Sequence, residues 1–184
     1  MKVRKQMAYI GAVFSISAHV RTGSDILDEV VAKTPVERPR PVNKRIQATM
    51  TNYIEGERIN GQEVLFADLA KQVLQRDPQS KKPLVCLMDG QRSLWDQQRE
   101  YLPQAIPIID IFHVSERLWE AAYCFHDPSS ADAEKMVCRY FRMLLDGEVD
   151  TVIRSFQARK RSLSKTKKKI LGDIIRYYKN NRQY

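Results

Sequence analysis

The sequence predicts an α/β fold over residues 1–113, followed by an all-helical part over residues 114–184. An apolar run from Leu84 to Met88 ends at Asp89-Gly90, which is typical of a buried strand that closes in a sharp turn. After His113, apolar residues recur at helical spacing. With 184 residues, of which 43% are hydrophobic, the chain can bury a core of ordinary size.

The first part of the chain predicts two strands and two helices. Residues 7–17 are apolar almost throughout, with β-branched and aromatic side chains, as expected of a strand covered on both faces. Ser24 is expected to cap a short helix over residues 25–33, and prolines then predict an extended connector. We expect a strand over residues 45–53 and an amphipathic helix over residues 63–76.

A central unit and a helical part follow. The unit consists of a strand over residues 83–89, a helix over 93–101 and a strand over 106–112. Ser115 is expected to cap the first helix of the remainder, which runs through Phe125. The further expected helices cover residues 131–145, residues 149–159 and a last basic segment that begins at Ser164.

Positive charge is concentrated at the end of the chain. From Glu148 to Tyr184 there are eleven Lys and Arg against three acids, a net +8 out of the +9 of the whole chain. Such a basic end is typical of a polyanion partner such as DNA, and an ordinary solvated helix face is the alternative. The candidate DNA-binding residues are Arg159, Lys160, Arg161, Lys165, Lys167, Lys168 and Lys169.

The cysteines and the first residues of the chain indicate in which cellular compartment the protein is expected. Three cysteines without a CxxC pair do not suit a disulfide framework, so we expect reduced, buried thiols in a cytoplasmic protein. A metal site shared by Cys124, His126 and Cys138 is a less favoured alternative. The charged residues 1–5 and the apolar residues after them imitate a signal peptide, but no stretch has the length of a membrane span.

Three polar residues could carry chemistry at the ends of the central strands. Asp89 can project beyond the sheet, although a turn aspartate that bonds its own backbone is locally the favoured interpretation. Asp110 could share a divalent ion with Asp89, or be satisfied by Arg117 or by helix amides. His113 could orient a carboxylate or a phosphate, or pack at the helix entrance.

The motifs that the sequence lacks disfavour several enzyme classes. The chain has no GxxxxGK[ST] loop, no GxGxxG, no GxSxG and no HExxH. Cys86 lies in the middle of an apolar run, where a thiol is normally inert. Nucleotide hydrolysis and cysteine-based catalysis are therefore disfavoured.

Four stretches together resemble the central region of bacterial insertion-sequence transposases of the Kra group. They are, in order, MAYIGAVFSIS, KKPLVCLMDGQRSLWDQQREYLP, IIDIFHVSERLWEAAYCFH and RMLLDGEVDTVIRSF. The resemblance implies a DDE enzyme with an RNase H-like core, which would cut and join DNA with Mg²⁺ or Mn²⁺. It identifies Asp89 as the second catalytic aspartate and a metal ligand, and Asp110 and His113 as an auxiliary D-x-x-H.

The resemblance also implies how the chain is divided and what it lacks. Residues 1–113 would be a partial RNase H-like core, and residues 114–184 a helical insertion. The first aspartate and the glutamate of the family pattern do not map onto this chain, which therefore looks like the middle of a longer transposase. We expect it to be inactive alone and marginally stable, with transposon-end DNA and full-length transposase as partners. The alternative is a basic DNA-binding protein without catalysis.

Overall fold

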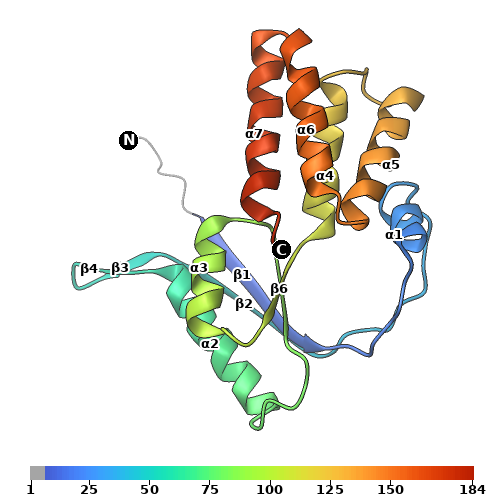
Figure 1. Cartoon of the computed structure of the whole chain (residues 1–184). Coiled ribbons are helices and arrows are strands. Elements are labelled where there is room, and N and C mark those ends of the chain that lie inside the picture. The colour runs from blue at the N-terminus through green and yellow to red at the C-terminus, as the bar shows by residue number, and fades with distance from the viewer. Residues whose placement is uncertain (1–6) are drawn as a thin grey trace. The chain divides into compact units, whose positions relative to one another are not determined.

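The computed structural model describes residues 7–184 and has a mixed α/β architecture (Figure 1). Seven α-helices and three two-stranded sheets are formed by these residues. The described chain divides into two compact units. Unit 1 comprises residues 7–19 and 38–108, and unit 2 comprises residues 20–37 and 109–184. The α/β class expected from the sequence is confirmed, while the RNase H-like identity of the core stays a prediction.

In unit 1, strands β1 (Ala8–Ser15) and β2 (Val42–Met50) form an antiparallel ladder in which Ile10 lies opposite Ala48. Helix α2 (Gly61–Arg76) packs on one face of this ladder. Burial therefore alternates along β1, and Ile10 on the other face is 71% exposed. The expectation that β1 is covered on both faces was wrong, because a helix covers only the face that carries Gly11 and its period-2 neighbours.

Two glycines allow α2 to approach the sheet closely. A Cβ on Gly11 would come within 2.9 Å of a methyl group of Leu69. A Cβ on Gly61, the first residue of α2, would lie 2.6 Å from the backbone carbonyl carbon of Met50. The Thr49 hydroxyl donates to the Gly61 carbonyl oxygen at 2.7 Å, so the start of α2 is fixed to the end of β2.

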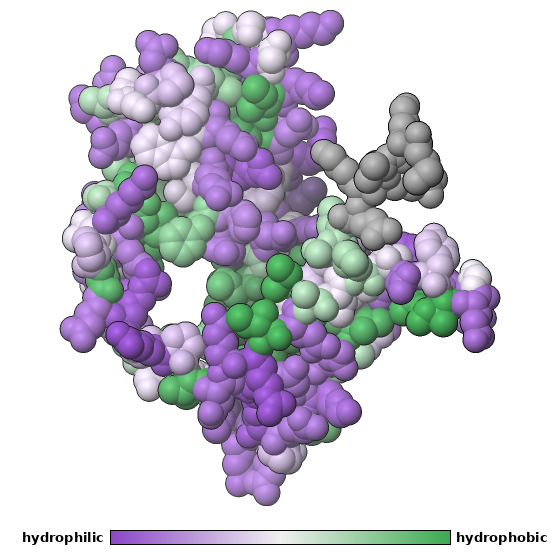
Figure 2. Space-filling view, turned by 180° about the vertical axis from the view of Figure 1, so that it is seen from behind, coloured by the Kyte–Doolittle hydropathy of each residue, from purple (hydrophilic) through white to green (hydrophobic). Residues whose placement is uncertain are grey.

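The rest of unit 1 is a hairpin and a strand–helix–strand segment. Strands β3 (Asn52–Ile54) and β4 (Glu57–Ile59) pair antiparallel and form a hairpin. This hairpin lies at the right of Figure 2, where green hydrophobic side chains are at its surface. Strands β5 (Val85–Met88) and β6 (Ile106–Ile109) pair with each other and are joined through α3 (Arg92–Tyr101).

Strand β5 is confirmed as a strand, but it is not fully buried. Met88 is buried, whereas Leu87 is 61% exposed and Val85 is also exposed. Val85 and Leu87 share one face of β5, because side chains alternate between the two faces of a strand, and that face is exposed. The apolar run therefore indicated the element correctly and its burial incorrectly.

Unit 2 is helical. Its helices are α1 (Gly23–Val30), α4 (Ile111–Tyr123), α5 (Ala131–Leu145), α6 (Val149–Arg159) and α7 (Lys165–Asn181), with the 3₁₀ turn η1 (Lys160–Ser162) before α7. The largest fully buried side chains of this unit include Phe141, Phe156 and Leu171. The rings of Tyr140 and Phe156 meet edge to face at 4.9 Å.

Two helix starts differ from the sequence prediction. Helix α1 is capped by Thr22 in a reciprocal capping box with Asp25, and not by Ser24. Helix α4 begins at Ile111 and is capped by Asp110. Ser115, the expected cap, is buried inside this helix, because the helical stretch continues further toward the N-terminus than its apolar spacing indicated.

The structure of residues 7–184 bears on the predictions about a membrane span and a signal peptide. Within residues 7–184, no helix has the length and apolar character needed to cross a membrane. The apolar stretch of the signal-like start forms β1. The charged residues 1–5 of that start lie outside the described residues.

Because the Tyr178 phenol is buried, we predict that unit 2 becomes less stable at alkaline pH. Its hydroxyl donates to the Val114 carbonyl oxygen at 3.0 Å, and burial raises the pKa of Tyr178 well above its usual value. A raised folded-state pKa contributes stability that is complete below the unfolded pKa of about 10 and is lost as the pH rises above it. Tyr178→Phe should therefore flatten the fall in unfolding free energy between about pH 9 and 11.

Chemical denaturation of both proteins, followed by far-UV circular dichroism, measures this pH dependence. Tyr53→Phe, at an exposed residue of β3, is the matched control and should leave it unchanged. Parallel pH profiles for Tyr178→Phe and the original chain would contradict the assignment.

Candidate nucleic-acid interface

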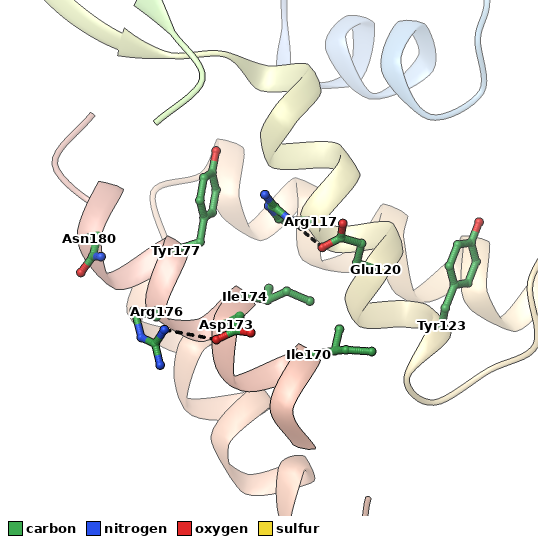
Figure 3. A pocket seen from close by; sticks show the side chains of 9 residues that line it. All are labelled: Arg117, Glu120, Tyr123, Ile170, Asp173, Ile174, Arg176, Tyr177 and Asn180. Carbon is green, nitrogen blue, oxygen red and sulfur yellow. Dashed lines mark hydrogen bonds and ion pairs between the residues drawn. The ribbon is translucent and has the colours of Figure 1, made fainter. Parts of the chain in front are cut away.

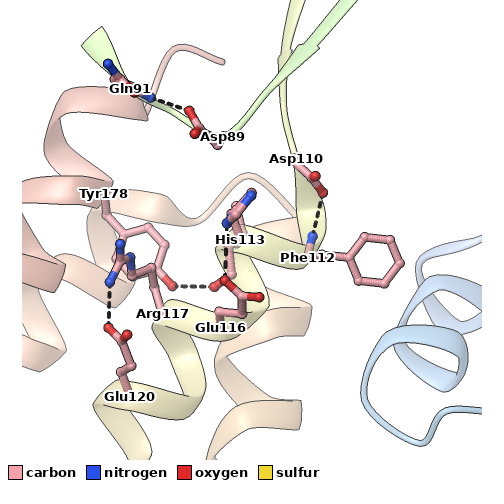
Figure 4. A network of polar contacts seen from close by, with 10 residues as sticks. Asp89, Gln91, Asp110, Phe112, His113, Glu116, Arg117, Glu120 and Tyr178 are labelled. Atoms are coloured by element: carbon pink, nitrogen blue, oxygen red, sulfur yellow. Dashed lines mark hydrogen bonds and ion pairs between the residues drawn. The ribbon is translucent and has the colours of Figure 1, made fainter. Parts of the chain in front are cut away.

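Asp89 follows β5 directly and lies in a tight turn. Its Oδ1 accepts a hydrogen bond from the Gln91 backbone N–H at 2.8 Å, and Gly90 takes the left-handed conformation with φ of 92° (Figure 4). The carboxylate lies at an exposed residue. This is the arrangement of a turn aspartate, the interpretation that the local sequence favoured. The catalytic role of Asp89 stays a prediction.

Asp110 caps α4, and His113 lies in the first turn of this helix. The Asp110 Oδ1 accepts from the Phe112 backbone N–H at 2.9 Å, so this carboxylate caps the helix (Figure 4). His113 Nδ1 lies 3.1 Å from a carboxylate oxygen of Glu116, one turn further along. Arg117 pairs with Glu120 at 2.8 Å and not with Asp110. Of the alternatives for Asp110, satisfaction by helix amides is the one that the structure contains.

The predicted metal ligands are divided between the two units. Asp89 belongs to unit 1, whereas Asp110 and His113 belong to unit 2. Between residues 7 and 184, no three His, Cys, Asp or Glu side chains are grouped so as to hold a metal ion, and this includes the alternative set with Cys124. Two divalent ions need several hard oxygen ligands, so the described residues do not fit them.

The cysteines are free thiols in packed surroundings. Cys124 is buried, and Cys86 and Cys138 are half-buried. Burial raises the pKa of the Cys86 thiol to about 11, so this thiol is protonated and a poor nucleophile near neutral pH. The structure therefore gives no support to cysteine chemistry at Cys86.

The cations predicted to bind DNA fall into two groups. One group, which we call the basic surface, consists of residues at η1 and in the first turns of α7: Arg161, Lys165, Lys167, Lys168 and Lys169. All are exposed except Lys168, which is half-buried. In the part of the chain that the structure describes, none of the five has an acidic partner within ion-pair distance.

Arg159 and Lys160 form the second group and pack against the helices. The Arg159 guanidinium carbon lies 3.8 Å from the centroid of the Phe125 ring, a cation–π contact. The Lys160 ammonium packs against Gly172, since a Cβ at that residue would lie only 2.7 Å from it. Both residues are half-buried. Phe125 follows α4 and Gly172 lies in α7, so no local pattern could have indicated these contacts.

The basic surface lies at an electrostatically unfavourable end of its helix. Ser164 caps α7, and the first turn of α7 contains no acidic residue. The N-terminal end of a helix carries partial positive charge, so each nearby lysine costs a few tenths of a kcal/mol up to about 1 kcal/mol. An anion bound there would remove this repulsion.

Comparison with known proteins does not identify the chain. It matches no protein-family model, and no curated protein or solved structure matches it significantly. The resemblance to Kra-group transposases stays a prediction from the sequence.

The role of Asp110 as a cap can be separated from a role that needs its charge. Asp110→Ala should lower the unfolding free energy by about 1 kcal/mol, because the Phe112 amide loses its partner. Asp110→Asn keeps an oxygen that can accept this bond and should be close to the original chain, since Asn caps helices as well as Asp does.

Urea denaturation of the three proteins measures the difference. Equal loss of stability in the Ala and Asn variants would mean that the negative charge, and not the cap, matters at this residue.

Proposed function

We propose that the chain binds DNA through the basic surface, by contacts to the phosphate backbone. The observation that supports this proposal is the set of five cations, Arg161 to Lys169, that have no acidic partner within the described chain and lie on a folded helical unit. Cations that neutralise phosphates release counterions from DNA, and this gives affinity without reading the base sequence.

Other cations of unit 2 provide a contrast. Arg117 pairs with Glu120, Lys135 with Asp132, and Arg176 with Asp173, each at i,i+3 spacing on one helix. Arg182 pairs with Asp150 at 3.4 Å. The three i,i+3 pairs are the solvated, locally compensated pairs of an ordinary helix surface. The basic surface differs because five cations without an acidic partner in the described chain are concentrated at η1 and the first turns of α7.

The resemblance to Kra-group transposases provides the context of the proposal. In this context the DNA is a transposon end, and strand cleavage and transfer belong to a complete enzyme that uses Mg²⁺ or Mn²⁺. A non-catalytic DNA-binding protein is the alternative, and it uses the same basic surface. The contacts of Asp89 and Asp110 with backbone amides are compatible with either.

Neutralising the basic surface should weaken binding to duplex DNA. We expect Lys165, Lys167, Lys168 and Lys169→Gln together to reduce the affinity for a duplex on the order of 10- to 100-fold at about 0.1 M salt. Gln is a good helix former, so α7 should persist. Fluorescence anisotropy with a labelled duplex of arbitrary sequence measures the affinity.

A matched control removes the same charge elsewhere. Lys44, Lys71, Lys81 and Lys82 are exposed residues of unit 1, and their replacement by Gln changes the net charge by the same amount. This variant and Asp89→Ala should both bind like the original chain. Equal losses in the two lysine variants would contradict a localised DNA interface and favour general charge attraction.

A further inference from the structure

Unit 2 also contains a groove between α4 and α7 with a volume of about 660 Å³. Figure 3 shows that Arg117, Glu120 and Tyr123 of α4 line one side and that residues of α7 line the other. Its apolar lining includes Tyr123, which is 39% exposed, and Ile170, which is 41% exposed. This volume lies in the range of pockets that hold ligands of the size of a nucleotide.

The polar groups of the groove are already held in place. Arg117 pairs with Glu120 at 2.8 Å, and its guanidinium carbon lies 5.3 Å from the centroid of the Tyr177 ring. On the α7 side, Arg176 pairs with Asp173 (Figure 3). The charges of the lining thus compensate each other, while hydrogen-bond donors and acceptors lie next to flat aromatic surfaces. This combination suits a neutral planar group with a polar edge.

One end of the groove is continuous with the basic surface. Ile170 follows Lys169 directly, and Lys167 lies one turn before Ile170 on the same face of α7. The end of α4 also lies next to this part of α7, because the Cys124 thiol, adjacent to Tyr123 in sequence, lies 3.8 Å from the Lys167 carbonyl oxygen. A chain that extends along the groove would therefore pass from a neutral aromatic lining to unpaired lysines.

From this juxtaposition we infer that the groove binds unpaired bases of a single-stranded nucleic acid whose phosphates lie on the basic surface. The inference rests on the proposed DNA-binding function and makes it more specific. Stacked bases on aromatic side chains combined with a basic track for the backbone are the usual means of single-strand binding. An amphipathic peptide would also fit an apolar groove, but the uncompensated lysines at its end favour a polyanion.

The test compares a labelled oligothymidine with a duplex of the same length. Tyr123→Ala should weaken binding of the single strand about 5- to 100-fold, the usual effect of losing one stacking partner. Its affinity for the duplex should stay unchanged. Ile170→Ser, at an exposed residue of the groove, should act in the same direction without opening the core. Tyr53→Ala in β3 is the matched control and should affect neither ligand.

Trp119 provides a readout that depends on the groove itself. Its ring lies 5.8 Å from that of Tyr123, and the chain has two tryptophans. In a Trp95→Phe background, the remaining fluorescence of Trp119 should be quenched by oligothymidine and not by the duplex. Circular dichroism confirms that each variant is folded.

The outcomes separate the inference from the proposed function. If the duplex binds through the lysines but Tyr123→Ala and Ile170→Ser bind the single strand like the original chain, the function stands and the groove inference is wrong. Equal losses for single strand and duplex, or capture of an amphipathic helical peptide with no quenching by oligothymidine, would also overturn it. Failure of both nucleic acids to bind would overturn the function and the inference together.

Discussion

Burial of one face of α7 against α4 and α6 determines where unit 2 presents its positive charge. Leu171 and Ile174 on this face are almost fully inaccessible, and the Tyr178 hydroxyl bonds to the α4 backbone. These contacts fix the rotation of α7 about its own axis. Lys165 and Lys169, four residues apart and off this face, are exposed, whereas Lys168, three residues before Leu171, continues the buried face and is half-buried.

The energetic balance of α7 explains how a basic helix start can persist. Lysines near a helix N-terminus oppose the helix dipole, and like charges in adjacent turns repel each other. Burying a Leu or Ile side chain contributes about 1.5 to 3 kcal/mol, so several buried residues outweigh this repulsion. The remaining electrostatic strain is what a polyanion would relieve. The same physical arrangement therefore holds the helix together and is consistent with the proposed polyanionic partner.

Most helices and strands of this chain could be predicted from its sequence, but the burial of their faces could not. The helix over residues 131–145 was predicted with the bounds that it has, and the structure shows that Ser130 caps it. The cap of α4 was predicted at Ser115 and not at Asp110, because the apolar residues on both sides of Asp110 predicted a single strand over residues 106–112. The exposure of β1 and β5 was missed, since a run of apolar residues does not tell whether one face or two faces find a partner.

At the candidate site, too, the local charge pattern could be predicted from the sequence and the packing could not. The basic segment is visible in the sequence as a charge excess, and its lysines are exposed as expected. Arg159 and Lys160, which were also predicted to bind DNA, pack against Phe125 and Gly172, and the charge pattern did not indicate these contacts. The groove depends on how α4 and α7 pack, and residues more than 40 positions apart form its two sides.

The salt dependence of duplex binding tests the central claim most directly, because it counts the phosphates that the protein neutralises. The account predicts that the logarithm of the association constant falls linearly with the logarithm of the salt concentration, with a slope of about −3 to −5 for the five cations of the basic surface. A slope near zero would contradict it, since binding would then not depend on phosphate contacts.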